Sequence, residues 1–204
     1  MDKIRIRNKE ELLNRKKNFL KIVDILEKKN VNFFLQGGVL LGARREQNFI
    51  KWDWDIEISL FSEELIDKFE LLIGDLEKNN YTIQNHNKTS YTPKISFINK
   101  KDESTSYSLI GWKHNKLLKC FTRKKFMIPE KFLIEFDKIE FLGKKFNCPK
   151  PIDQYLEHHY GNWKKPLMSS NKQEYLNKNF YKNKENFFDM MYKLCDFLKR
   201  YIKW

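Results

Sequence analysis

Apolar positions follow a helical period in the first part of the chain and a strand period further on. Residues 8–30 place apolar side chains three and four positions apart, which predicts an amphipathic helix with one buried face. The run VNFFLQ that follows is β-branched and aromatic, and predicts a short buried strand. After a pair of glycines, VLLGARRE predicts a short helix, and residues 62–79 predict another that Ser62 caps.

Beyond residue 79 the pattern becomes that of a sheet. The runs YTIQNH, TPKISFIN, SYSLIGW and LLKCFT predict strands of a largely antiparallel sheet. Residues 136–149 predict a hairpin with its turn at Leu142, Gly143 and Lys144. Strands between flanking helices predict an α+β fold with a mixed, largely antiparallel sheet.

The end of the chain returns to helical spacing. Residues 152–160 predict a helix that Gly161 stops, and an apolar stripe over about residues 186–203 predicts a C-terminal helix. The polar stretch 169–186 predicts a loop between them. No internal repeat divides the chain, so we expect a single domain over residues 1–204.

Residues 53–60 alternate strictly and begin with acids at every second position. In a strand Asp53, Asp55 and Glu57 share one face, while Trp54 and the isoleucines face the core. Alternate Cα atoms lie about 6.5–7 Å apart, so neighbouring carboxylates can converge on one ion. Such carboxylates repel one another unless a cation lies among them, and Mg²⁺ or Mn²⁺ prefers oxygen ligands. The alternative, without a metal, is a half-exposed edge strand whose acids pair with surface lysines; it explains the same pattern of alternate acids.

The pair Gly37–Gly38, between a predicted strand and a predicted helix, is the second candidate feature. Glycine allows positive φ and close approach of the backbone, and the start of a helix presents N–H groups that suit a phosphate. A glycine turn followed by alternate acids therefore predicts a phosphate cradle beside a metal site.

Together these residues resemble a known signature. The segment QGGVLLGARREQNFIKWDWDIEI resembles the GG(S/T)LLGAxR and WDxDxD motifs of the LicD/fukutin family. A later block, FDKIEFLGKKFNCPKPIDQYLEHHYGNWKKP, resembles the family's Tyr-Gly-x-x-Trp-x-x-Pro type motif, with Tyr160, Gly161, Trp163 and Pro166. The two blocks bracket a motif core of about residues 30–166, most of the chain.

The resemblance implies a nucleotidyltransferase fold, similar to polymerase β, with a mixed sheet flanked by helices. Family members move a phospho-alcohol, such as phosphocholine or ribitol phosphate, from a CDP-activated donor to a sugar hydroxyl, and CMP leaves. By this resemblance we expect a metal-dependent phosphotransferase that uses Mg²⁺ or Mn²⁺. Its expected acceptor is a cell-surface glycan or lipid-linked sugar, such as a lipopolysaccharide or a capsule polysaccharide.

The resemblance also implies roles for individual residues. Asp55 and Glu57 match the paired metal carboxylates, and Asp53 matches the additional acid before them. All three are therefore expected metal ligands, with Asp53 as the acceptor of the proton from the attacking hydroxyl. Gly37 and Gly38 match the phosphate-facing turn.

One match and one departure complete the comparison. Arg45 matches the arginine that ends the short helix, and is expected to bind phosphate or hold the carboxylates. Ser108 stands on a following strand where the superfamily has a third carboxylate. Serine is a poor metal ligand, so Asp53, Asp102 or Glu103 would have to replace that acid.

The net charge of +13 favours an anionic partner: a phosphorylated molecule, a nucleic acid or an acidic membrane surface. No groove-binding motif is recognisable and the basic residues are dispersed, so no specific nucleic-acid partner is expected. Three widely spaced cysteines without a CxxC pair indicate a reducing compartment. Without an apolar leader or a membrane-length apolar run, we expect a cytoplasmic protein with, at most, peripheral contact at the inner membrane face.

Two other functions stay open from the sequence. Nucleotidyl transfer to a small molecule or RNA would keep the fold and release pyrophosphate instead of CMP. An inactive basic binding protein would explain Ser108 in place of an acid. The pair His158–His159 fits no zinc spacing, and we expect it on the surface of a helix.

Overall fold

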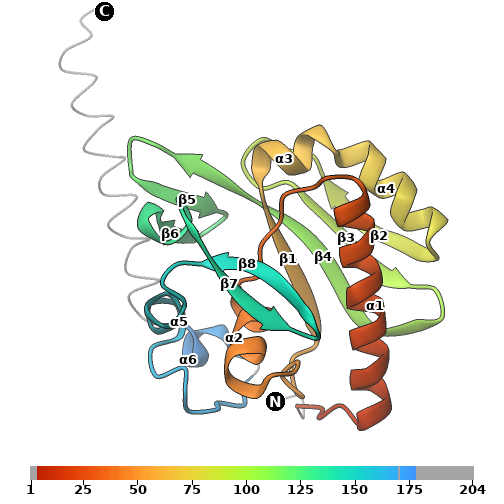
Figure 1. Ribbon diagram of the computed structural model, residues 1–204, viewed down its shortest axis with the longest axis horizontal. Helices are drawn as coiled ribbons and strands as arrows, with labels where there is room; N and C mark the ends of the chain where they lie inside the picture. Colours follow the sequence, from red (N-terminus) through yellow and green to blue (C-terminus); the bar gives the residue numbers. More distant parts are fainter. Residues whose placement is uncertain (1–3, 170, 178–204) are drawn as a thin grey trace, which may run out of the picture.

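The computed structural model describes residues 4–169 and 171–177, and these residues form a mixed α+β fold (Figure 1). The predicted C-terminal helix and Cys195 lie outside the described residues. The helices are α1 (Lys9–Lys28), α2 (Gly37–Glu46), α3 (Ser62–Asp67), α4 (Phe69–Lys78), η1 (Glu130–Phe132), α5 (Ile152–Tyr160) and α6 (Lys172–Tyr175). The strands are β1 (Asp55–Phe61), β2 (Tyr81–Asn87), β3 (Lys94–Asn99), β4 (Asp102–Asn115), β5 (Cys120–Arg123), β6 (Phe126–Pro129), β7 (Phe136–Phe141) and β8 (Lys144–Pro149).

The long strand β4 organises the main sheet. It pairs antiparallel with β3 and β5, and parallel with β1, so the sheet is mixed as predicted. Strand β2 extends the sheet beyond β3, and β6 extends it beyond β5. The predicted hairpin forms the separate two-stranded sheet β7–β8, and its turn uses positive φ at Leu142 and Gly143.

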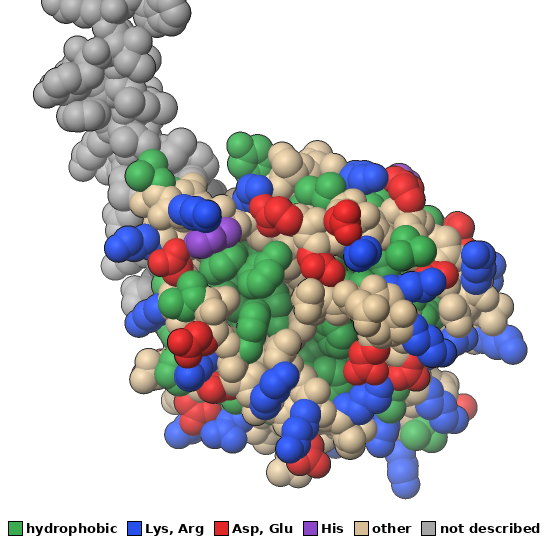
Figure 2. Space-filling view, turned by 45° about the horizontal axis from the view of Figure 1, so that its top comes forward, with side chains coloured by type: hydrophobic (Ala, Val, Ile, Leu, Met, Phe, Trp, Pro, Cys, Tyr) green, Lys and Arg blue, Asp and Glu red, His purple; other side chains and the backbone are tan. Residues whose placement is uncertain are grey.

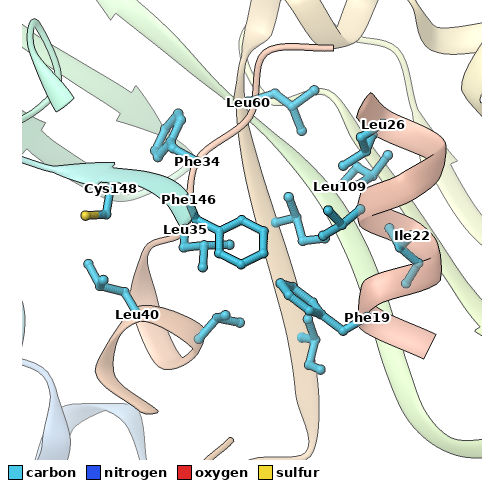
Figure 3. Packing of buried hydrophobic residues seen from close by; sticks show 14 of the residues in the cluster. Phe19, Ile22, Leu26, Phe34, Leu35, Leu40, Leu60, Leu109, Phe146 and Cys148 are labelled. Carbon is cyan, nitrogen blue, oxygen red and sulfur yellow. The ribbon is translucent and has the colours of Figure 1, made fainter. Parts of the chain in front are cut away.

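Alternation along the strands buries one face of the main sheet beneath α1 and α4, which lie side by side (Figure 1). Ile22 and Leu26 of α1 point toward Leu109 of β4, and all three side chains are buried (Figure 3). The apolar stripe of residues 8–30 is thus the core face of α1. A capping box between Asn8 and Glu11 fixes where this helix begins.

Three local predictions were wrong. VNFFLQ does not form a strand: Phe34 makes only one bridge, to Ser59 of β1. The predicted helix over residues 62–79 is broken into α3 and α4 at Lys68, whose φ of -94° and ψ of 7° are not helical. Ser62 is the first residue of α3 rather than its cap, and its hydroxyl is buried without a hydrogen-bond partner among the described residues.

Basic side chains are scattered and mixed with acidic ones on the face shown in Figure 2. A hollow lined by hydrophobic side chains lies near the middle of this face. This side of the described molecule therefore has no continuous basic stripe. Within the described residues, no helix has both the length and the apolar character that crossing a membrane requires.

Candidate functional site

The glycine turn and the first acid lie in contact. Gly37 begins α2 with a φ of +60°, the conformation for which glycine is suited. A Cβ atom on Gly38 would lie 2.4 Å from Oδ2 of Asp53, so any larger residue would displace the carboxylate. A hydrogen bond from the Asp53 N–H to the Ile50 carbonyl, 3.2 Å long, closes the turn that brings this acid back to α2. Both features predicted from the sequence therefore meet here.

The other two acids lie on β1, facing away from the core. Asp55 and Glu57 are half-buried on one face of the strand, while Ile56 and Ile58 are buried on the other. Trp54 was expected in the core but is 66% exposed, because β1 begins only at the next residue.

Two of the three acids thus share a strand face, and Asp53 stands just before it. Among the described residues, no three acids, histidines or cysteines lie close enough together to hold a metal ion by themselves. The structure therefore places Asp53 at the turn and aligns Asp55 with Glu57, but does not gather the three into a preformed cage.

Ser108 lies next to Glu57, where the resemblance implied a third carboxylate. The parallel register of β1 and β4 pairs Glu57 with Ser108, and the hydroxyl of Ser108 lies 3.1 Å from that of Ser96 on β3. Since a strand rises about 3.3 Å per residue, Asp102 lies roughly 20 Å along β4 from Ser108. Glu103 is the next residue along the same strand. Neither acid stands close to Ser108.

Two buried arginines beside Asp53 were missed from the sequence. Arg15 of α1 is fully buried, and its Nε donates a 3.3 Å hydrogen bond to the hydroxyl of Thr105. Arg7 donates 3.1 Å hydrogen bonds to the carbonyls of Trp54 and Ser104, which joins the start of β1 to β4. In the sequence both arginines look like surface charges of a basic N-terminal segment, so no signal distinguished them.

These arginines set the electrostatics of the acid. Burial raises the pKa of Asp53, and the positive charges of Arg15 and Arg7 oppose that rise. Burial also lowers the pKa of Arg15 to about 10, so it remains protonated at neutral pH. Desolvation and the two neighbouring cations therefore act on the pKa of Asp53 in opposite directions.

Helix α5 supports the glycine turn from behind. The hydroxyl of Tyr155 donates a 2.5 Å hydrogen bond to Oε1 of Gln36, the residue that precedes the glycines. The Tyr160 hydroxyl lies 3.9 Å from the place that a Cβ on Gly37 would occupy. His159 packs beneath Tyr155 and is only 8% exposed, so the expected surface position is wrong for it. Burial lowers the pKa of His159 to about 3.

Arg45 ties α2 to the second motif block. Its Nη1 donates a 3.1 Å hydrogen bond to the carbonyl of Trp163, and its Nη2 lies 2.7 Å from Oε1 of Glu46. Its guanidinium also lies over the ring of Trp52, 6.0 Å from the centroid. These contacts hold the two blocks together, and contact with phosphate stays a prediction. Arg44 forms an exposed ion pair with Asp153.

Comparison with known proteins agrees with this arrangement. Residues 30–151 match the family described as LicD/FKTN/FKRP, nucleotidyltransferase domain. Because the match covers more than half of the chain, this protein belongs to that family, and its fold is nucleotidyltransferase-like. A shorter stretch of 44 residues, 22% of this chain, is 39% identical to the ribitol 5-phosphate transferase FKRP of Mus musculus and of Homo sapiens. That stretch covers 9% of each relative's length, and the family match points to a transferase domain.

Proposed function

We propose that this protein is a metal-dependent phosphotransferase of polymerase-β-like fold. It moves a phospho-alcohol from a CDP-activated donor to a sugar hydroxyl of a glycan and releases CMP. The observation that carries the proposal is the contact of Asp53 with Gly38, followed by Asp55 and Glu57 on one strand face. The name of the mammalian relatives, ribitol 5-phosphate transferase, supports a phospho-alcohol of that class.

The acids fit a hard divalent cation such as Mg²⁺ or Mn²⁺. Carboxylate oxygens are the ligands that these ions prefer, and Glu57 is half-buried without an ion pair among the described residues. Proteins usually hold Mg²⁺ by one or two carboxylates together with substrate phosphates, so Asp55 and Glu57 need no third protein ligand. An ion bound there would neutralise charge on the donor phosphates.

The protein's own groups account for the remaining requirements of the reaction. The N–H groups at the start of α2 bind a donor phosphate, and Gly37 and Gly38 have no side chain that would keep a ligand from the backbone. Asp53 lies beside that turn and accepts the proton of the attacking sugar hydroxyl. Arg7 and Arg15 favour its ionised form, which is the form that can take up a proton.

The test is CMP release from CDP-ribitol and CDP-choline, with polysaccharide and lipid-linked acceptors, in Mg²⁺ and in EDTA. We expect release only with Mg²⁺, and none with Asp55→Asn. Asp67→Asn is the matched control, because its side chain is 72% exposed on α3. Wild-type release by Asp55→Asn would refute the assignment.

Repeating the assay with a nucleoside triphosphate as the donor tests the nearest alternative. Nucleotidyl transfer would leave a nucleotide on the acceptor and release pyrophosphate from a nucleoside triphosphate. Mass analysis of the acceptor distinguishes the two, since phospho-alcohol transfer adds no base to it.

A further inference from the structure

Two cations share the sheet face that carries the acids. Lys94 of β3 pairs with Ile110 of β4, two residues beyond Ser108, which pairs with Glu57. Residues that pair across neighbouring strands, and alternate residues within a strand, point to the same face. The half-buried side chain of Lys94 therefore stands on the face of Asp55 and Glu57.

Arg123 of β5 reaches the same face. Phe121, two residues earlier, pairs with His114 and stacks on Phe61 of β1 with ring centroids 5.2 Å apart. Phe61 is on the side of β1 that carries Glu57, so Phe121 and Arg123 face that side too. Arg123 is only 6% exposed, and its Nε has no hydrogen-bond partner among the described residues.

Glu57 is the anion that acts on both cations. Burial lowers the pKa of Lys94 and of Arg123, and the charge of Glu57 opposes the change in each case. Neither cation forms an ion pair with it in the described part of the chain. Burying the Arg123 guanidinium without a bonded anion costs free energy of folding. An anionic ligand bound between Arg123 and Lys94 would offset that cost.

Ser108 makes the same place suitable for an anion. A carboxylate here would repel a phosphate. In the Ser96–Ser108 pair one hydroxyl donates to the other, so the second hydroxyl hydrogen can be donated to a ligand. A guanidinium also matches two phosphate oxygens at once. The buried Arg123, the half-buried Lys94, a hydroxyl donor and the lack of an acid at Ser108 all favour an anionic, phosphate-like ligand.

We infer that Lys94 and Arg123, with the Ser96–Ser108 pair, bind the diphosphate group of a nucleotide-linked substrate. The cations lie on β3 and β5, beside the strand β4 where a third acid was expected, and contact the diphosphate oxygens directly. Only the identification of the ligand with the donor of the transfer reaction rests on the proposed function. The anion site itself rests on the sheet register and on the buried, unpaired guanidinium.

Titration of the full chain with inorganic pyrophosphate, in EDTA and in Mg²⁺, tests the site by calorimetry. Arg123→Gln and Lys94→Met should each weaken the Kd about tenfold or more, since each removes a charged contact. Lys116→Met, an equal loss of charge at an exposed position between β4 and β5, should change it less than about twofold.

Equal, small weakening in all three variants would overturn the inference, because binding would then follow only the net charge. Absence of saturable binding to the wild-type chain in both buffers would overturn it as well. Thermal melts check folding, and if Arg123→Gln unfolds, the half-buried Lys94→Met decides the outcome. If the wild type binds pyrophosphate and Lys94→Met weakens that binding, but no Mg²⁺-dependent CMP release is found, the anion site stands and the proposed transferase activity does not. Normal CMP release by both folded variants would keep the transferase and show that the donor does not bind at the anion site.

Discussion

On β1, Ile56 and Ile58 point into the core, whereas Asp55 and Glu57 point from the opposite face of the same strand. The apolar face of the sheet lies beneath α1, whose Ile22 and Leu26 point toward Leu109 of the neighbouring strand β4. The face that carries Asp55 and Glu57, here called the polar face, collects acids, hydroxyls and two cations from β1, β3, β4 and β5 beside the stacked rings of Phe61 and Phe121. One alternating sequence therefore serves both folding and chemistry.

This contrast makes the two faces separable by mutation. Truncation on the apolar face removes packing and lowers the free energy of unfolding. Substitution on the polar face removes charge from half-buried groups, and is expected to lower activity far more than stability.

The largest effect is expected from Glu57→Gln on the polar face. It removes a proposed metal ligand, so the kcat of CMP release should fall at least about a thousandfold, or about 4 kcal/mol in the barrier. The midpoint of urea unfolding should fall only slightly, because Glu57 forms no ion pair in the described structure and acts on Lys94 and Arg123 only through its charge. A variant that unfolds readily while its folded molecules stay active would contradict the division between the faces.

The apolar face is tested by Leu109→Ala. Its side chain is fully buried, and its truncation should lower the free energy of unfolding by about 3 kcal/mol. Leu13→Ala on α1 is the control, because this leucine is 50% exposed and should cost under about 0.5 kcal/mol. CMP release per folded molecule should be unchanged in both leucine variants. A large loss of kcat in folded Leu109→Ala would argue against the division of roles between the two faces.

The contact between the glycine turn and Asp53 is tested by Gly38→Ala. The added methyl group would displace the carboxylate, so CMP release should fall about 10- to 100-fold. Gly74→Ala in α4 is the matched control, because nothing lies within 4 Å of its added Cβ. That control should gain about 0.5–1 kcal/mol of stability from helix propensity alone. Equal activity of the two variants would show that this contact does not matter.

The buried His159 of α5, behind the glycine turn, should make the free energy of unfolding depend on pH by about 2 kcal/mol. His159 has a folded pKa near 3, so below the unfolded value of about 6.5 the unfolded chain binds the extra proton. The free energy of unfolding is therefore unaffected by His159 above pH 6.5, where its side chain is neutral in both states, and declines as the pH falls below that value. Between pH 7 and 5 the wild type should lose about 2 kcal/mol more than His159→Gln in urea unfolding. Parallel curves would mean that His159 titrates normally.

The sequence predicted the elements better than their junctions. The periodicity of α1, of most of the strands and of α5 gave these elements correctly, because each buries a regular apolar stripe. It misplaced Trp54, because strict alternation continued through a residue that precedes β1. It also overlooked β6, a four-residue edge strand without a strong pattern.

The candidate site was predicted only where its residues are close in sequence. Asp53 and Gly38 belong to one motif, and the structure brings them into contact. Arg15, Lys94 and Arg123 come from distant elements, and in a chain this rich in lysine and arginine nothing marks them out. Only the register of β4 with its neighbours shows which basic residues share the face of the acids.

The most direct test of the central claim is Mn²⁺ binding, measured by electron paramagnetic resonance with and without CDP. We predict one site whose affinity for Mn²⁺ rises when CDP is present, since nucleotide phosphates complete the coordination. Asp55→Asn should abolish that site, while Asp67→Asn should leave it unchanged. Equal Mn²⁺ affinity in the wild type and in Asp55→Asn would contradict the account.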